Sequence, residues 1–383
     1  MLLIKNVRIL TASDRDYDRG CILVDKGKIK GISENIEEEN AAVIDGEGMT
    51  AVPGFIDAHT HLGMWEDAIE FEGADGNEMT DPITPEMRAI DGINPMDRTF
   101  EDAYKGGITS VASGPGSSNV IGGQFAAIKT YGICIDDMII KEPIAVKCAF
   151  GENPKRVYGD EQRKTPMTRM ATAALLREAL TEAREYMEGR EAEDEDDRPD
   201  FNFRWEAMIP LMKKQIPLKA HAHRADDIFT ALRIAGEFDL DITLDHCTEG
   251  HLIADHIKKS GKKALVGPSL SERAKFELKN LTFDTPGILS ARGVEVSIIT
   301  DHPVIPIQYL PLCAALAVKA GMNREEAFRA LTVNPARALG IDDRVGSLEE
   351  GKDADIVLWN GDPLEFNSEV MYTIINGEVV YKR

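Results

Sequence analysis

Six of the eight histidines in this 383-residue chain stand at or beside the end of a short apolar segment. Short apolar segments bounded by turn residues predict buried β-strands. Polar groups at buried strand ends must be hydrogen-bonded or bound to a metal, and imidazole is a common metal ligand in proteins. The clustering therefore indicates a metal site. The six are His59, His61, His221, His223, His246 and His302.

His59 and His61 form a His-x-His pair in the segment FIDAHTHL. Residues two apart in a strand point to the same side, so the two imidazoles can share one metal ion. Taken alone, the pair fits equally well with two histidines that are hydrogen-bonded in a polar interior.

Three further strand ends offer ligands of the same kind. LKAHAHR carries His221 and His223, ITLDHCTEG carries His246, and VSIITDHPV ends at Asp301. In a parallel barrel the carboxyl ends of all strands meet at one mouth. Four strand ends that each deliver a histidine or an aspartate to this mouth predict a metal centre there.

Strands and helices alternate between residues 53 and 344, which predicts a (β/α)8 barrel, an α/β fold. A helix is expected over 165–188, with Thr165 and Pro166 at its start. The glycine-rich segment 114–124 is expected to be a loop. Residues 1–52 and 345–383 consist of short strands with tight turns, so we expect them to form one small composite β-sandwich.

The composition excludes some partners. A formal net charge of −22 repels nucleic acid and anionic lipid. The five scattered cysteines contain no Cys-x-x-Cys pair, and the N-terminal segment does not resemble a signal peptide. Apolar runs are too short to span a membrane. We expect a cytoplasmic protein that binds a small molecule, with no membrane or nucleic-acid partner.

Several longer motifs carry a family resemblance. PGFIDAHTHLG, GGITSVAS, NPARALG and GSLEEGKDADIVLWNGDP resemble segments of the amidohydrolase superfamily, and the similarity extends over the whole chain. Within the superfamily the chain is most similar to imidazolonepropionase-like proteins and metal-dependent Xaa-Pro dipeptidases. The resemblance implies a barrel enzyme with one or two divalent cations, expected to be Zn²⁺, and a homo-oligomeric state.

The resemblance also implies roles for individual residues. His59, His61 and Asp301 would bind the more buried metal ion. His221 would be the ligand from the fifth strand, and His246 would bind metal or polarise the substrate carbonyl. Asp301 would also act as the general base. A divalent cation lowers the pKa of bound water toward 7, which makes hydroxide available at neutral pH.

The segment IAVKCAFGEN offers two candidates for a group that bridges two metals. Binuclear relatives often use a carboxylated lysine at the end of the fourth strand, which would be Lys147. Burial lowers the pKa of an amine and so makes it reactive toward carbon dioxide. Glu152 is the alternative bridge, and a mononuclear site without a bridge is the third possibility.

The sequence after the fifth strand differs from the pattern of two groups of enzymes in the superfamily. Imidazolonepropionases and cytosine-deaminase-like members have a glutamate three residues after the strand-five histidine, where this chain has Arg224. Arg224 would bind a substrate carboxylate or form a surface ion pair. His223 would contact substrate or play a purely structural part, and His302 would position Asp301 or line the cleft.

These observations predict hydrolysis of an amide-type C–N bond by metal-bound hydroxide. The substrate would be a small N-acyl amino acid, dipeptide or cyclic amide. One alternative is a mononuclear deaminase or cyclic-amide hydrolase of the same fold. A second is a non-catalytic binding protein that kept the barrel.

Overall fold

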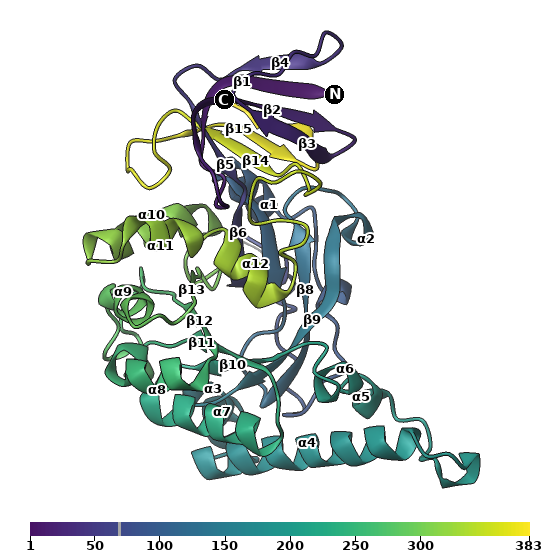
Figure 1. Ribbon diagram of the computed structural model, residues 1–383. Coiled ribbons are helices and arrows are strands. Elements are labelled where there is room, and N and C mark those ends of the chain that lie inside the picture. The colour runs from purple at the N-terminus through teal and green to yellow at the C-terminus, as the bar shows by residue number, and fades with distance from the viewer. Residues whose placement is uncertain (68–69) are drawn as a thin grey trace.

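A computed structural model describes residues 1–67 and 70–383; residues 68 and 69, in the long loop after the first barrel strand, lie outside the described residues. The chain forms two eight-stranded sheets, with the N- and C-terminal strands together above a helix-covered barrel (Figure 1). The barrel strands follow one another in chain order around the sheet. They are β6 (Phe55–Thr60), β7 (Ile108–Ser113), β8 (Ile121–Lys129), β9 (Ile139–Ala149), β10 (Leu218–Ala222), β11 (Ile242–His246), β12 (Lys263–Val266) and β13 (Val296–Ile298).

Hydrogen bonds just beyond β6 and β13 bring the first and last barrel strands together. The Asp301 amide donates to the His59 carbonyl at 3.2 Å, and the His61 amide donates to the His302 carbonyl at 2.9 Å. The expected barrel is confirmed, and the closure sets the first and last candidate ligand segments side by side.

One barrel strand differs from the regular pattern. β8 runs antiparallel to both of its neighbours, β7 and β9, whereas the other paired barrel strands are parallel. The expected loop over 114–124 is therefore wrong from Ile121 onward, where β8 begins. All nine residues of β8 are buried, so their backbone groups must be paired, and β7 and β9 provide the partners.

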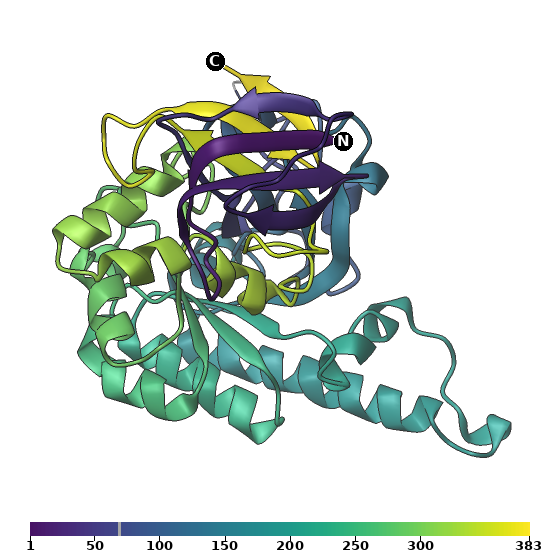
Figure 2. The same ribbon diagram turned by 45° about the horizontal axis from the view of Figure 1, so that its top comes forward.

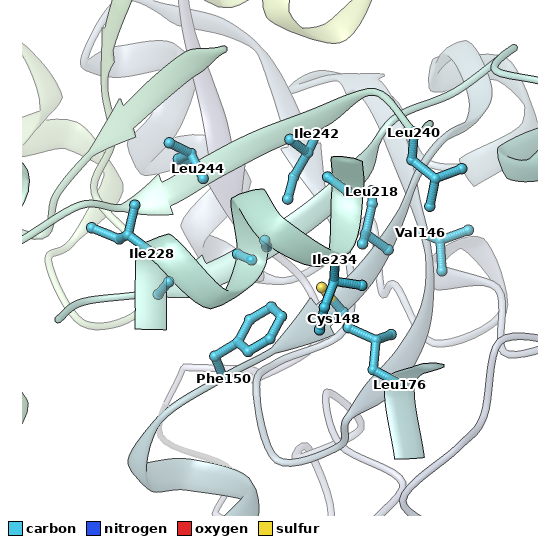
Figure 3. Close-up of a cluster of buried hydrophobic side chains, with 14 of the residues drawn as sticks. Val146, Cys148, Phe150, Leu176, Leu218, Ile228, Ile234, Leu240, Ile242 and Leu244 are labelled. Carbon is cyan, nitrogen blue, oxygen red and sulfur yellow. The ribbon is translucent and has the colours of Figure 1, made fainter. Parts of the chain in front are cut away.

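Helices cover the outside of the barrel, and none in the described part of the chain combines the length and apolar character needed to cross a bilayer. Figure 3 shows one such contact, where Ile228 and Ile234 of α7 pack on Leu218 and Ile242 of the adjacent strands. The helices are α1 (Arg98–Lys105), α2 (Ile135–Met138), α3 (Glu152–Pro154), α4 (Arg169–Arg190), α5 (Phe203–Glu206), α6 (Ile209–Met212), α7 (Ala225–Glu237), α8 (Ala254–Ser260), α9 (Asp284–Ala291), α10 (Leu310–Lys319), α11 (Arg324–Arg329) and α12 (Val333–Leu339).

The long helix α4 begins later than the sequence predicts. Its N-cap is Thr168, whose hydroxyl accepts a hydrogen bond from the Ala171 amide at 3.1 Å. Thr165 and Pro166 precede the helix instead of starting it. Two threonines three residues apart offer the same capping chemistry, and the second one is used.

The terminal strands form the expected composite β unit, built from both ends of the chain, and they are joined in one branched sheet. A single hydrogen-bonded sheet branches at β1, because β2 pairs along one edge while β4 and β5 share the other. Figure 2 shows this sheet from above, over the barrel. Its strands are β1 (Leu2–Ile9), β2 (Tyr17–Asp25), β3 (Lys28–Ser33), β4 (Ala42–Asp45), β5 (Thr50–Pro53), β14 (Ile356–Trp359), β15 (Val370–Ile375) and β16 (Glu378–Lys382). The exact division of the chain at 52/53 and 344/345 stays a prediction.

Candidate metal centre

Candidate ligands from five positions of the barrel converge on a cavity of about 560 Å³. The strands that carry them are β6, β9, β10 and β11, together with the segment after β13. All of these strands are parallel, so their carboxyl ends share one mouth. The sequence-predicted residues that line the cavity are His61, Lys147, His221, His223 and Asp301.

The first group of ligand atoms surrounds Asp301. Its Oδ1 lies 3.4 Å from His59 Nε2 and 3.2 Å from His61 Nε2. His246 joins this group, since its ligand atom lies within 4.8 Å of those of His59 and Asp301. In a tetrahedral zinc site with bonds of about 2.1 Å, ligand atoms lie roughly 3.4 Å apart. The two shorter distances fit that spacing.

Backbone strain accompanies these ligands. Asp301 has a φ of 55° and His246 a φ of 75°, both in the left-handed region that few side chains adopt. Such conformations cost about 1–3 kcal/mol each and persist where the surrounding structure imposes them, often at functional sites. The strain supports a chemical role for both side chains.

A buried carboxylate orients His59. Asp245 Oδ2 accepts from His59 Nδ1 at 2.6 Å and lies 3.0 Å from the ammonium of Lys219. Although burial by itself raises it, Lys219 and His59 hold the pKa of Asp245 well below its usual range. Burial, with Lys147 and Lys219 nearby, lowers the pKa of His59 to about 4. The ring is therefore neutral, and Nε2 carries the lone pair that would bind a metal.

Two glycine carbonyls orient the other imidazoles. His61 Nδ1 lies 2.7 Å from the Gly114 carbonyl, and His246 Nδ1 lies 2.8 Å from the Gly267 carbonyl. Gly267 has a φ of +148°, and a Cβ there would lie 2.1 Å from the Ile299 carbonyl oxygen, so no other residue fits. Each carbonyl needs a donor at Nδ1, which leaves Nε2 as the acceptor that faces the cavity.

A second group consists of His221, His223 and His246, whose ligand atoms all lie within 4.8 Å of one another. His221 Nε2 and His246 Nε2 are buried and lack a hydrogen-bond partner among the described residues. Burial lowers the pKa of both imidazoles. A buried unsatisfied nitrogen costs about 1–3 kcal/mol, and a cation removes that cost by accepting the lone pair. These donors fit a divalent transition metal.

Lys147 lies beside the first group, on the wall of the same cavity. Its side chain is fully buried, and Nζ is 3.0 Å from His59 Nε2. Burial, opposed by Asp245 and Asp301, lowers the pKa of Lys147 to about 8. The structure therefore places a reactive amine beside the predicted ligands. Among the described residues, no group of candidate metal ligands contains Glu152.

Arg224 and His302 are placed differently from the other candidates. The Arg224 guanidinium donates to both carboxylate oxygens of Asp226, at 2.9 and 2.8 Å, and the residue is not among those that line the cavity. His302 accepts from the Ile307 amide at its Nδ1, at 3.2 Å. The cationic side chains on the cavity wall are instead Lys147, Arg156 and Lys275.

Sequence reasoning missed four buried groups near the centre. Three of them carried a signal: Asp57, Lys219 and Asp245 are charged residues inside apolar strands, which indicates pairing. Asp57 accepts from the amide and hydroxyl of Thr300, and burial raises its pKa to about 7. The fourth is Glu277, in a short 3-10 turn, η5 (Phe276–Leu278), outside every predicted strand.

Comparisons with known proteins agree with this picture. A family model described as "Amidohydrolase family" matches residues 50–380. A crystal structure titled as an amidohydrolase from Thermotoga maritima MSB8 is 42% identical, with a TM-score of 0.97 and full coverage of both chains. A prolidase complexed with N-methylphosphonate-L-proline, 16% identical with a TM-score of 0.62 and full coverage of both chains, shares the fold.

Curated relatives are more distant in sequence. The amidohydrolase tasK of Hapsidospora irregularis is 28% identical over 94% of this chain, and an adenine deaminase of Clostridium perfringens is 27% identical over 100% of this chain. This chain spans only 39% and 59% of those two proteins. An imidazolonepropionase of Rhizorhabdus wittichii is 27% identical, with 88% of this chain and 85% of that protein covered. From the family model and the barrel geometry together, the chain belongs to the amidohydrolase family.

Proposed function

We propose that this protein is a metal-dependent hydrolase that cleaves an amide-type C–N bond of a small substrate. The observation that supports this most strongly is a pair of buried nitrogens without a partner in the described part of the chain, His221 Nε2 and His246 Nε2, with Asp301 close to His246. A bound divalent cation, Zn²⁺ by expectation, would supply an acidified water and polarise the scissile carbonyl.

The chain's own groups would carry the protons. Although burial by itself raises it, His246, His59 and His61 hold the pKa of Asp301 well below its usual range, so the carboxylate is charged and can accept a proton. Asp301 would take the proton of the attacking water and pass it to the leaving nitrogen. The neutral imidazole of His246, whose Nε2 is an acceptor, would bind the cation that polarises the carbonyl.

The cavity wall favours a substrate that carries a carboxylate. Lys275 and Arg156 line the cavity of a chain whose net charge is −22. Lys275 donates to the Asn153 side chain at 2.9 Å, which fixes its position at the wall. These cations support N-acyl amino acids and dipeptides as substrates, and cyclic amides that carry a carboxylate are a third class.

A panel assay tests the proposal. The protein is stripped with a chelator, reloaded with Zn²⁺, Mn²⁺ or Co²⁺, and offered N-acyl amino acids, dipeptides, cyclic amides and nucleobases. The proposal predicts metal-dependent cleavage of a carboxylate-bearing amide. Ammonia release from a nucleobase alone would favour the deaminase reading, and the similarity to an adenine deaminase is why that class is included. No turnover with any reloaded metal would contradict an enzymatic role.

Carboxylation of Lys147 gives a further prediction. The buried amine is expected to carry one CO₂ group, visible as added mass in native mass spectrometry and lost after acid treatment. Lys147→Ala is expected to hold one metal ion fewer, with partial recovery of activity in short carboxylic acids that replace the carbamate. An unmodified Lys147 in a fully metal-loaded, active protein would contradict the carbamate.

Lys275 and Arg224 are compared as partners of the substrate carboxylate. A hydrogen bond to a charged group contributes about 1.5–3 kcal/mol, so Lys275→Gln is expected to raise KM for the charged substrate at least about tenfold. Because Asp226 already occupies the Arg224 guanidinium, Arg224→Gln is expected to change KM less. The same measurements on an uncharged analogue show whether either effect depends on the carboxylate. The opposite order would assign the carboxylate to Arg224.

A further inference from the structure

Glu277 is an acidic side chain that the mechanism above does not use. It is 1% exposed and enters the centre from η5, on the loop that follows β12. One carboxylate oxygen, Oε2, accepts from the Glu152 amide at 3.1 Å. This bond fixes the carboxylate, and its other oxygen, Oε1, is directed toward the histidines of β10.

Oε1 faces two imidazole nitrogens without bonding to either. It lies 3.9 Å from His221 Nε2 and 3.8 Å from His223 Nε2, beyond hydrogen-bond distance. Oε1 is itself buried and has no hydrogen-bond partner among the described residues. Its nearest cation, Lys275 Nζ, is also 3.9 Å away.

Three buried ligand atoms in this part of the centre have no hydrogen-bond partner among the described residues: Glu277 Oε1, His221 Nε2 and His246 Nε2. A buried polar atom without a partner destabilises the folded chain, and a cation bound by these atoms would remove that cost. His223 adds a fourth atom, since its Nδ1 is held by the Thr248 hydroxyl at 2.7 Å and its Nε2 faces the same group.

We infer that Glu277 and His223 join His221 and His246 as ligands of a second divalent cation. The donor set is three imidazoles and one carboxylate, which suits zinc and similar ions. The present spacings of 3.8–3.9 Å exceed the roughly 3.4 Å of a tetrahedral zinc site by a few tenths of an ångström, so small side-chain shifts complete the coordination.

This inference rests on the proposed function and deepens it. His246 belongs to both groups of ligand atoms, so the two ions would lie next to each other, with Lys147 on the wall of the same cavity. The second ion would then depend on a loop carboxylate from the seventh barrel position as well as on any bridge from Lys147. Residues near Glu277 on the same loop, such as Lys275, would also connect substrate binding to that ion.

Zinc binding to the whole protein, stripped and then titrated with Zn²⁺ alone, tests the inference. We expect two ions per wild-type chain, measured by elemental analysis after desalting and by calorimetry. Glu277→Gln keeps the shape and removes the charge, and it is expected to lose one ion or weaken its binding at least about 100-fold, because even partners outside the coordination sphere change affinity 10–100-fold. His223→Gln is expected to act in the same direction.

Glu272→Gln is the matched control, since Glu272 carries the same charge on the same loop and lines the cavity but is exposed. It is expected to hold two ions. Circular dichroism checks that each variant is folded. If Glu277→Gln does not fold, the zinc content of His223→Gln tests the inference.

The outcomes separate the inference from the proposed function. A wild-type chain that binds no zinc would contradict the proposed function itself. Two ions in wild type and two in both Glu277→Gln and His223→Gln, with unchanged affinity, would overturn the inference and leave the proposed function standing. A single ion in wild type would also overturn the inference.

Discussion

Asp301→Asn is expected to lower kcat by about 10³-fold or more while the protein keeps its fold. General-base catalysis contributes roughly 10²–10⁴-fold, and the substitution also weakens a metal ligand. Asn has nearly the same shape as Asp, and the Asp301 side chain faces His59 and His61 instead of the apolar core. The measurement is kcat on the best substrate of the panel, with the thermal midpoint recorded beside it.

The control for Asp301→Asn is Asp239→Asn, an exposed aspartate paired with Lys214 far from the cavity. It carries the same chemical change and is expected to leave kcat unchanged. A rate for Asp301→Asn within tenfold of wild type would remove Asp301 from the role of general base. Loss of fold in the variant would be visible as a lowered thermal midpoint.

His59→Ala is expected to abolish binding of the more buried metal ion and, with it, measurable turnover. His59 is fully buried, its Nε2 faces Asp301, and Asp245 fixes its other nitrogen. A ligand present at 100 times its Kd stabilises the folded state by about 2.7 kcal/mol. Chelation should therefore lower the melting temperature of wild type by more than that of the variant, which has only the second ion left to lose.

His256→Ala provides the comparison for His59→Ala, because His256 packs against Phe229 outside the centre. This variant should keep the wild-type metal content and the wild-type response to chelator. His59→Ala with a full complement of metal would remove His59 from the ligand set. Unfolding of His59→Ala even with excess zinc present would instead indicate that Asp245 needs its imidazole partner for folding.

Much of the centre follows from the sequence because strand ends are easy to recognise. His59, His221, His246 and Asp301 each stand directly at or after an apolar segment, and parallel strands bring such ends together. The structure places all four around one cavity mouth, with candidate ligand atoms a few ångströms apart. Their individual roles stay predictions until metal binding is measured.

Other features were beyond reach because they depend on contacts between distant segments. Glu277 lies in a short turn that follows no strand directly, and only the folded chain brings it beside His221, 56 positions earlier in the sequence. The antiparallel direction of β8 was hidden by its glycines, which are typical of loops but fit here between two crowded strands. From the sequence, Arg224 could bind a substrate carboxylate or pair with a nearby acid. Only the folded chain shows that its guanidinium is paired with Asp226, two residues away.

The buried pair of Lys219 and Asp245 is an intermediate case. Each residue interrupts an apolar strand, which predicts a partner, but the sequence does not say which one. The strands β10 and β11 are neighbours, and this adjacency places the ammonium 3.0 Å from the carboxylate that orients His59. A charged residue inside a barrel strand is thus a useful sign of a group that supports the site.

The central claim is that this barrel mouth binds divalent metal, and the most direct test is metal content per chain. Protein purified without chelator is desalted and measured by elemental analysis against its concentration from amino-acid analysis. The account predicts two equivalents of zinc or a similar transition metal per chain. A value near zero that stays near zero after incubation with Zn²⁺, Mn²⁺ and Co²⁺ would contradict it.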